Sequence, residues 1–139
     1  MSKRVQQLIE KTNQRTVFHA LGIEIDKLDA DETVVSLQVD DRHFQHVGLV
    51  HGGIYVLLAE SAASLAAACT LSDEDSSVVA LEINANHLQS VTQGKLVARS
   101  HALHQGRRTL VYEVRVVNEH NKLISIARCT LMKTPLPGR

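Results

Sequence analysis

A glutamate set in an apolar helical stretch is the residue of this sequence best suited to chemistry. The stretch 52–69 is almost wholly apolar or small, which predicts a helix buried on every side, and Glu60 is its one charged residue. An ionised carboxylate in such surroundings loses much of its hydration energy unless partners replace the water. The pattern favours a catalytic carboxylate. The alternative is that Glu60 points into solvent from a narrow exposed stripe.

Two glycines at the start of this stretch could bind an oxygen of the reacting group. Gly52 and Gly53 have no side chain to obstruct a ligand, and the first N–H groups of a helix lack intrahelical partners. Aided by the positive end of the helix dipole, these N–H groups can form an oxyanion hole for a carbonyl under attack. The alternative is that His51, Gly52 and Gly53 form only a tight strand-to-helix turn.

The spacing of these groups predicts a site shared between two chains. His51 and Glu60 are nine positions apart, which on a helix means roughly 13 Å of rise and opposite faces. They cannot serve one carbonyl within one chain. If both are catalytic, two central helices must lie side by side in a symmetric dimer. Ser64 lies one turn beyond Glu60 on the same face and could share its site directly.

Three segments carry a family resemblance. They are residues 45–53 (QHVGLVHGG), 58–61 (LAES) and 81–87 (LEINANH). Together they resemble the hotdog-fold acyl-CoA thioesterases of the phenylacetic-acid-degradation type. The most similar branch holds 4-hydroxybenzoyl-CoA thioesterase, 1,4-dihydroxy-2-naphthoyl-CoA hydrolase and the enterobactin proofreading thioesterase. The resemblance extends from about Phe18 to Met132.

The resemblance implies an α+β hotdog fold, in which a curved antiparallel sheet wraps a long central helix. It also implies a thioesterase for acyl-CoA, with an aromatic acyl group expected and with active sites shared across a homodimer that pairs into a homotetramer. Neither a metal nor a cofactor is expected, since coenzyme A is part of the substrate. Apolar residues that could shape the acyl pocket are Phe44, Tyr55, Val56 and Leu57.

Three alternatives stay open beside this interpretation. The thioester could be carried by an acyl or aryl carrier protein instead of coenzyme A. The protein could be a non-catalytic acyl-CoA binding module, although a site for a neutral acyl chain gains nothing from Glu60. A hotdog-fold hydratase is a third possibility, but no Asp and His pairing of the kind those enzymes use is found around His51.

The resemblance further implies roles for single residues. Gln45 corresponds to a glutamine that helps to orient the thioester near the oxyanion hole, and His87 faces the active site. Glu60 is expected to act as nucleophile or as general base, with Ser64 holding water or orienting the carboxylate. His51 could steer Gln45 or line the site, and its alternative role is to cap the helix.

Cations for the phosphates of coenzyme A are expected at one hairpin. The formal net charge is zero, so cations must be concentrated where the nucleotide lies. The segment 104–108 is the best local cluster, and the resemblance places nucleotide contacts there and just after the third strand. The alternative is that a polar hairpin tip is basic only for solubility. The expected substrate-binding residues, besides His87, are Ser90, His104, Gly106, Arg107 and Arg108.

A metal site is weighed and disfavoured. His43, His46 and His51 lie close in sequence, but no nearby Asp or Cys completes a convincing ligand set. Cys69 and Cys129 lack metal-site spacing, and we expect both to be buried reduced thiols.

Composition excludes several other classes of protein. A chain of 139 residues with 44% hydrophobic content suits one domain spanning 1–139 and leaves no room for a second. A pI of about 7.1 and an aromatic content of 3% argue against binding to nucleic acid. No membrane association is expected, since no apolar run approaches the length of a membrane span, and a cytoplasmic protein is the default.

Periodicity predicts the remaining elements. A helix capped by Ser2 is expected to run to about Phe18, with Gly22 ending the segment. In the third strand, Leu81 is expected on the same face as His87. The tail 134–139 has no pattern and is expected to be mobile. The predicted strands begin at Ile23 and then cover 33–39, 78–88, 95–104, 109–118 and 122–133.

Overall fold

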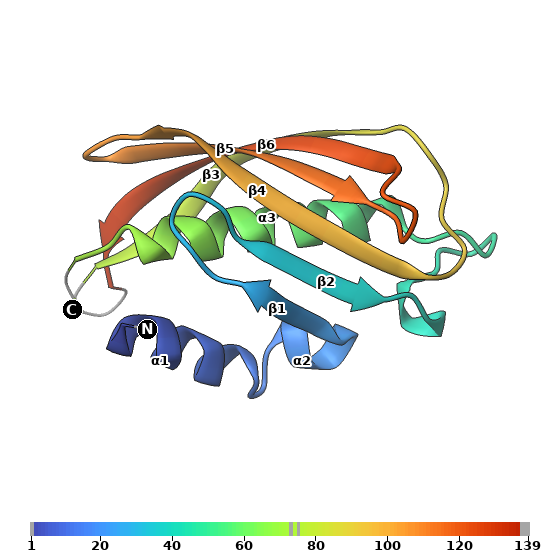
Figure 1. Cartoon of the computed structure of the whole chain (residues 1–139), viewed down its shortest axis with the longest axis horizontal. Helices are drawn as coiled ribbons and strands as arrows, with labels where there is room; N and C mark the ends of the chain where they lie inside the picture. The colour runs from blue at the N-terminus through green and yellow to red at the C-terminus, as the bar shows by residue number, and fades with distance from the viewer. Residues whose placement is uncertain (1, 73, 75, 137–139) are drawn as a thin grey trace.

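One long helix lies in the concave side of a six-stranded antiparallel sheet in the computed structural model, which describes residues 2–72, 74 and 76–136 (Figure 1). The strand order is β1-β2-β4-β5-β6-β3. The predicted α+β hotdog architecture is confirmed. The elements are α1 (Lys3–Thr12), α2 (Val17–Leu21), β1 (Ile23–Lys27), β2 (Val34–Gln38), the 3-10 helix η1 (Asp41–His43), α3 (Gly52–Cys69), β3 (Ser76–His87), β4 (Lys95–Gln105), β5 (Thr109–Val117) and β6 (Leu123–Pro135).

The central helix α3 is enclosed because its residues are apolar and small. Alanines let the strands approach the helix backbone closely, and Leu58 and Tyr55 fill the larger gaps between them. By length and composition alone α3 could cross a membrane, but 56% of it is buried inside this domain, as the core helix of a folded protein is. The alanines of α3 in the core are Ala59, Ala62, Ala63, Ala66 and Ala67.

One face of α3 is not enclosed, which corrects the expectation that the helix is buried on every side. The uncovered face is a lengthwise strip of residues that are half-buried or exposed at helical spacing. Glu60 is half-buried at the middle of this strip, so the narrow-stripe alternative describes its position in the single chain. The strip is otherwise apolar or small, unlike a solvated helix face. We call it the α3 strip, and it consists of Gly53, Val56, Leu57, Glu60 and Ser64.

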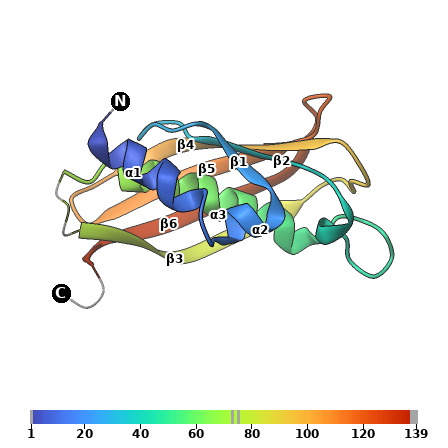
Figure 2. The same ribbon diagram turned by 90° about the horizontal axis from the view of Figure 1, so that it is seen from below.

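The N-terminal segment forms two helices where one was expected. Ser2 caps α1 as predicted, accepting a hydrogen bond from the N–H of Val5. The helix ends at Thr12, with Asn13 as its C-cap, and a second one begins because the Thr16 side chain caps α2. Gly22 ends α2 in the left-handed conformation, with φ of 69°. Figure 2 shows α1 and α2 one after the other along the face of the molecule opposite the sheet.

A β-bulge in β3 changes which residues face the helix. The register with β6 shifts between Ala80 and Glu82, so Leu81 is the extra residue and is 55% exposed. Val78 and Ala80 pack on the core before the bulge, and the inward positions after it have odd numbers. The expectation that Leu81 shares the face of His87 is therefore wrong, because the alternation is broken at this residue.

Strand β3 is an edge of the sheet. It pairs only with β6 among the described strands, and the segment 88–94 carries the chain across the sheet to β4 (Figure 2). Its other side therefore presents unpaired backbone N–H and C=O groups. At the chain's end, Thr134 and Pro135 belong to β6, where the sequence showed no strand pattern. Residues 137–139 lie outside the described residues.

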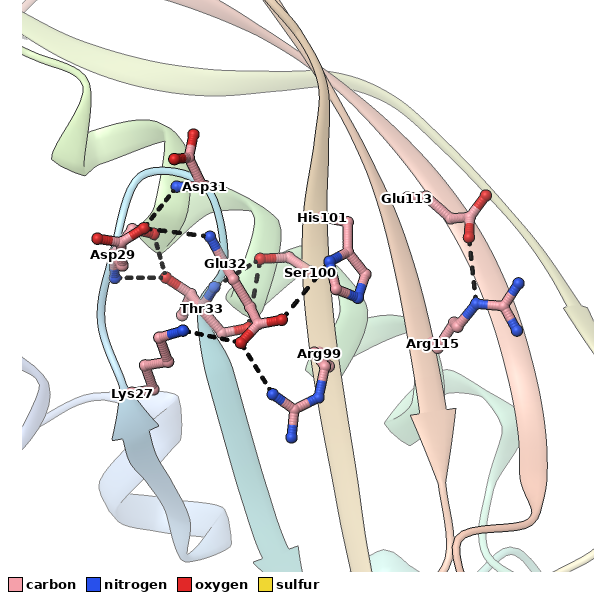
Figure 3. A network of polar contacts seen from close by, with 10 residues as sticks. All are labelled: Lys27, Asp29, Asp31, Glu32, Thr33, Arg99, Ser100, His101, Glu113 and Arg115. Carbon is pink, nitrogen blue, oxygen red and sulfur yellow. Dashed lines mark hydrogen bonds and ion pairs between the residues drawn. The ribbon is translucent and has the colours of Figure 1, made fainter.

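A charged cluster fixes the β1–β2 turn against β4 (Figure 3). The carboxylate of Glu32 accepts hydrogen bonds from Nζ of Lys27 at 2.8 Å and from Nη1 of Arg99 at 2.9 Å. These contacts, that of Lys27 foremost, lower the pKa of Glu32. Beneath it the N–H of Thr33 donates to Oγ of Ser100 at 3.0 Å. These contacts therefore hold the beginning of β2 against β4 in the curved sheet.

The packing around α3 predicts a large cost for removing one of its leucines. The Leu58 side chain is fully buried at 0% exposure, so Leu58→Ala is expected to lower the free energy of unfolding by about 2 to 5 kcal/mol. The control is Leu103→Ala, which deletes the same atoms at a residue that is 56% exposed and should change stability by less than about 0.5 kcal/mol. Urea denaturation of both variants measures the difference. Equal losses would contradict the assignment of Leu58 to the core.

Candidate active site

The loop that leads into α3 is fixed by Asp40 and His43. The N–H of Asp40 donates to Nδ1 of His43 at 2.9 Å, and Nε2 of His43 lies 2.8 Å from the carbonyl oxygen of Leu21. Hydrogen bonds from Arg42 hold the pKa of Asp40 down at about 2. Both ring nitrogens of His43 are thus used inside the protein. The residue serves as a structural tie, and neither nitrogen has a lone pair left for a metal.

Gln45 follows His43 by two residues and lies at the start of a tight turn. Its N–H donates to the carbonyl of Leu49 at 2.8 Å, and the N–H of Gly48, whose φ is 86°, donates back to the carbonyl of Gln45 at 3.1 Å. The side-chain Oε1 of Gln45 accepts a hydrogen bond from the N–H of Val47. Because the oxygen is held there, the amide NH2 of Gln45 is the end left to donate to a ligand.

The first turn of α3 is capped by His51. Its Nδ1 accepts a hydrogen bond from the N–H of Gly53 at 2.8 Å, so the capping alternative is the arrangement observed. The N–H of Gly53 is therefore occupied. The N–H of Gly52 donates to no other residue in the described part of the chain. Of the two glycines expected to form an oxyanion hole, Gly52 is the one with an available donor.

The ring of His87 packs directly on Gly52. A Cβ atom at residue 52 would lie 3.0 Å from both Cδ2 and Nε2 of His87, so only glycine leaves room for the ring. Tyr55, one turn along the helix, meets the same imidazole edge to face, with ring centroids 5.1 Å apart. Burial raises the pKa of Tyr55, which keeps the phenol neutral.

These side chains surround a cavity of about 300 Å³ at the N-terminal end of α3. It brings together five of the residues that the sequence singled out, two of them from loops that are far apart in the chain. Its wall includes an amide donor from Gln45, a backbone donor from Gly52 and the imidazole of His87, beside apolar side chains. The lining residues are Gln45, Leu49, Val50, Gly52, Tyr55, His87, Leu88, Gln89 and Ser90.

Glu60 and Ser64 lie outside this cavity. Glu60 is eight residues along α3 from Gly52, roughly 12 Å of helix rise, and it makes no hydrogen bond or ion pair with any other described residue. Ser64 follows on the same strip. Beneath them, burial raises the pKa of Cys129 to about 12, and Glu60 adds to this effect. A thiol of that acidity stays protonated and is not a nucleophile.

The expected nucleotide-binding hairpin lies at the opposite end of the sheet from the cavity (Figure 1). The 11 residues of β4 separate its tip from the loop that holds Ser90, roughly 35 Å of extended chain. Arg107 and Arg108 are exposed at the tip, where the ring of His104 covers Gly106. One chain therefore does not bring these four residues to the cavity.

Two groups of residues around the cavity were missed by sequence reasoning. Leu88 and Gln89 line its rim because β3 ends at His87, and no motif marked them. Ser125 on β6 contacts His87 from behind, and only the strand pairing, which the sequence did not specify, could have found it. Of the residues expected to shape an acyl pocket, Tyr55 lines this cavity, whereas Phe44, Val56 and Leu57 lie outside its lining.

Within the described ranges no three His, Cys, Asp or Glu side chains are grouped as metal ligands.

Comparisons with known proteins agree with this geometry. The family model described as the thioesterase superfamily matches residues 47–125, which include Glu60 and every lining residue of the cavity except Gln45. The 1,4-dihydroxy-2-naphthoyl-CoA hydrolase of Listeria monocytogenes is 43% identical over 111 residues, which are 80% of this chain and 89% of that protein. The proofreading thioesterase EntH of Cronobacter turicensis is 33% identical over 120 residues, covering 86% and 87% of the two chains.

A solved structure extends the match over the whole chain. The crystal structure of the thioesterase HI1161 from Haemophilus influenzae superimposes with a TM-score of 0.88 at 35% sequence identity, covering 100% of this chain and 96% of that one. Fold, family model and sequence identity all agree. The chain therefore belongs to the thioesterase superfamily and has its hotdog fold.

Proposed function

We propose that this protein hydrolyses acyl-CoA thioesters and binds the thioester carbonyl at the N-terminal end of α3. The observation that carries the proposal is a cavity lined by both Gln45, whose amide NH2 is left to donate, and Gly52, whose N–H donates to no other described residue. Two donors and a helix N-terminus suit the negative charge that develops on a carbonyl oxygen under attack. The apolar side chains of Leu49, Val50 and Leu88 form part of the cavity wall and suit an apolar acyl group.

Glu60 would act on this carbonyl from a second copy of the chain. The α3 strip is apolar around the carboxylate, and β3 is an edge with unpaired backbone groups beside it. Two copies related by a two-fold axis could cover both features at once. Antiparallel central helices would then bring Glu60 of one copy to Gly52 of the other. The same symmetry would bring the basic hairpin of one copy nearer the partner's cavity, where Arg107 and Arg108 could meet phosphates.

The chemistry we favour is nucleophilic. The carboxylate of Glu60 attacks the thioester carbonyl, the C–S bond breaks, and the thiolate leaves while an acyl anhydride remains on the enzyme. Water then opens the anhydride, which releases the carboxylic acid and regenerates Glu60. In the alternative, Glu60 takes a proton from water, and the resulting hydroxide attacks directly. Ser64, one turn along the strip, would hold the water or orient the carboxylate in either case.

An aromatic acyl group on coenzyme A is the substrate we favour. The relative named as a dihydroxynaphthoyl-CoA hydrolase supports an aromatic acyl-CoA, and the relative named as a proofreading thioesterase supports thioester hydrolysis. A carrier-protein thioester is the alternative, since the same carbonyl site would accept either thiol carrier. A cytoplasmic location and assembly of dimers into a homotetramer belong to the same proposal.

Replacing the carboxylate is expected to abolish turnover but not binding. Glu60→Gln keeps the shape of the side chain and removes its nucleophilicity and basicity, so kcat should fall at least about a hundredfold while acyl-CoA affinity is retained. Thiol release from benzoyl-CoA, a hydroxybenzoyl-CoA and a medium-chain acyl-CoA measures it, with calorimetric binding in parallel. The matched control is Glu24→Gln on the exposed side of β1, which should leave turnover unchanged. Binding without turnover by the wild type would favour the binding module instead.

A mixing experiment tests whether the site is shared between chains. Gln45→Ala should reduce turnover about a hundredfold by removing an oxyanion donor, and Glu60→Gln reduces it for the reason above. If the site is shared, random exchange of equal amounts of the two variants makes about half of the dimers mixed. In each mixed dimer, one of the two sites has both native residues. Activity should therefore recover to about a quarter of that of the wild type. The measurement is thiol release before and after co-refolding. No recovery would mean that both residues serve one chain.

A further inference from the structure

A buried serine lies behind the cavity and has no part in the proposed reaction. Ser125 pairs in register with His87 across β6 and β3, and its side chain is 1% exposed. Its Oγ lies 2.8 Å from Nδ1 of His87 and 3.2 Å from the carbonyl oxygen of Asn86. The hydroxyl therefore touches two groups of β3 at once, of which one is an imidazole that lines the cavity.

The proton count at this hydroxyl indicates which nitrogen of the imidazole carries the proton. A carbonyl oxygen can only accept, so the contact with Asn86 is a hydrogen bond only if Ser125 donates its single proton there. Oγ of Ser125 must then accept from His87, which places the ring proton on Nδ1. In a neutral imidazole the other nitrogen, Nε2, keeps a lone pair and is an acceptor.

Nε2 of His87 lies beside Gly52, next to the proposed oxyanion site. Nε2 is one of the two ring atoms against Gly52, at 3.0 Å from where a Cβ would stand. Tyr55 also contacts this imidazole, with an interplanar angle of 67° between its ring and that of His87. The cavity thus offers donors from Gln45 and Gly52 and, next to them, an acceptor from His87. A ligand with a carbonyl oxygen and a nearby hydroxyl matches this set of donors and acceptor.

We infer that Ser125 is a positioning residue that holds His87 in its Nδ1–H form, so that the cavity selects acyl groups bearing a hydroxyl next to the thioester carbonyl. The inference rests on the proposed function for its substrate, but the proton position is a property of the resting protein. Without Ser125 no hydroxyl would remain at this contact to accept from Nδ1. The ring could then carry its proton on Nε2, which could no longer accept a hydrogen bond from a substrate hydroxyl.

Substrate selectivity tests the functional part. The wild type should prefer 2-hydroxybenzoyl-CoA to benzoyl-CoA in kcat/KM, and Ser125→Ala should lower this ratio by about threefold to tenfold, the worth of one neutral hydrogen bond. The matched control is Ser100→Ala, which removes another fully buried serine hydroxyl, bonded to Thr33 and remote from the cavity. It should leave the ratio unchanged. An unaltered ratio in Ser125→Ala, or an equal fall in Ser100→Ala, would overturn the inference.

Nitrogen-15 NMR of the imidazole tests the proton position without any turnover. In the wild type at mildly alkaline pH, where imidazoles are neutral, the signal of His87 should report a protonated Nδ1, and Ser125→Ala should shift the proton toward Nε2. His87→Gln assigns the signal by its loss. If the imidazole of His87 in the wild type is protonated on Nε2, the inference is wrong even if the enzyme is active. An enzyme inactive on every acyl-CoA defeats the proposed function instead, while the NMR still decides the role of Ser125.

Discussion

The burial of α3 is the constraint on which the rest of this structure depends. A helix of 18 residues with one charged side chain has no broad face that can be left in water. A flat sheet would cover one side only, so the sheet must curl around the helix. The alanines of α3 make the close approach of β4, β5 and β6 possible, and the bulge at Leu81 lets β3 follow the same curve.

The enclosure leaves two parts of α3 accessible, and both are chemically distinctive. At its N-terminus the helix presents a backbone donor beside a cavity, the N–H of Gly52, which has no acceptor among the described residues. Along the α3 strip it presents a carboxylate among apolar residues, at Glu60. The helix's own length keeps these groups apart in one chain. In the mechanism proposed here, the separation becomes useful only through symmetry, because a two-fold axis turns two distant groups of one chain into neighbours.

The polar groups around the cavity are each oriented by one local partner. The N–H of Val47 holds the oxygen of Gln45, the N–H of Gly53 holds the ring of His51, and the hydroxyl of Ser125 meets the ring of His87. Each of these contacts comes from a different part of the fold: a turn, a helix cap and a strand pair. Groups held in this way need little reorganisation when charge develops on a ligand, which is the condition for electrostatic catalysis.

The sequence alone determined the elements and the chemistry of single residues. Periodicity located α3 and the strands, since burial imposes a period on side chains whatever the tertiary contacts are. The motifs around Gly52 and Glu60 indicated the family, and helix geometry alone showed that these groups cannot meet within one chain. Local signals failed where one residue changed the pattern, as at Thr16, which begins a second helix, and at Leu81, which reverses the alternation.

The tertiary structure decided which of these groups work together. The sequence could not choose between Gly52 and Gly53, because the choice depends on a hydrogen bond from Gly53 to the ring of His51. Nor could it link Ser125 to His87, since they are 38 residues apart and meet only through the β3–β6 pairing. Local sequence encodes local conformation, but hydrogen-bond partners across strands depend on strand order and register, which arise only when the whole sheet closes around α3.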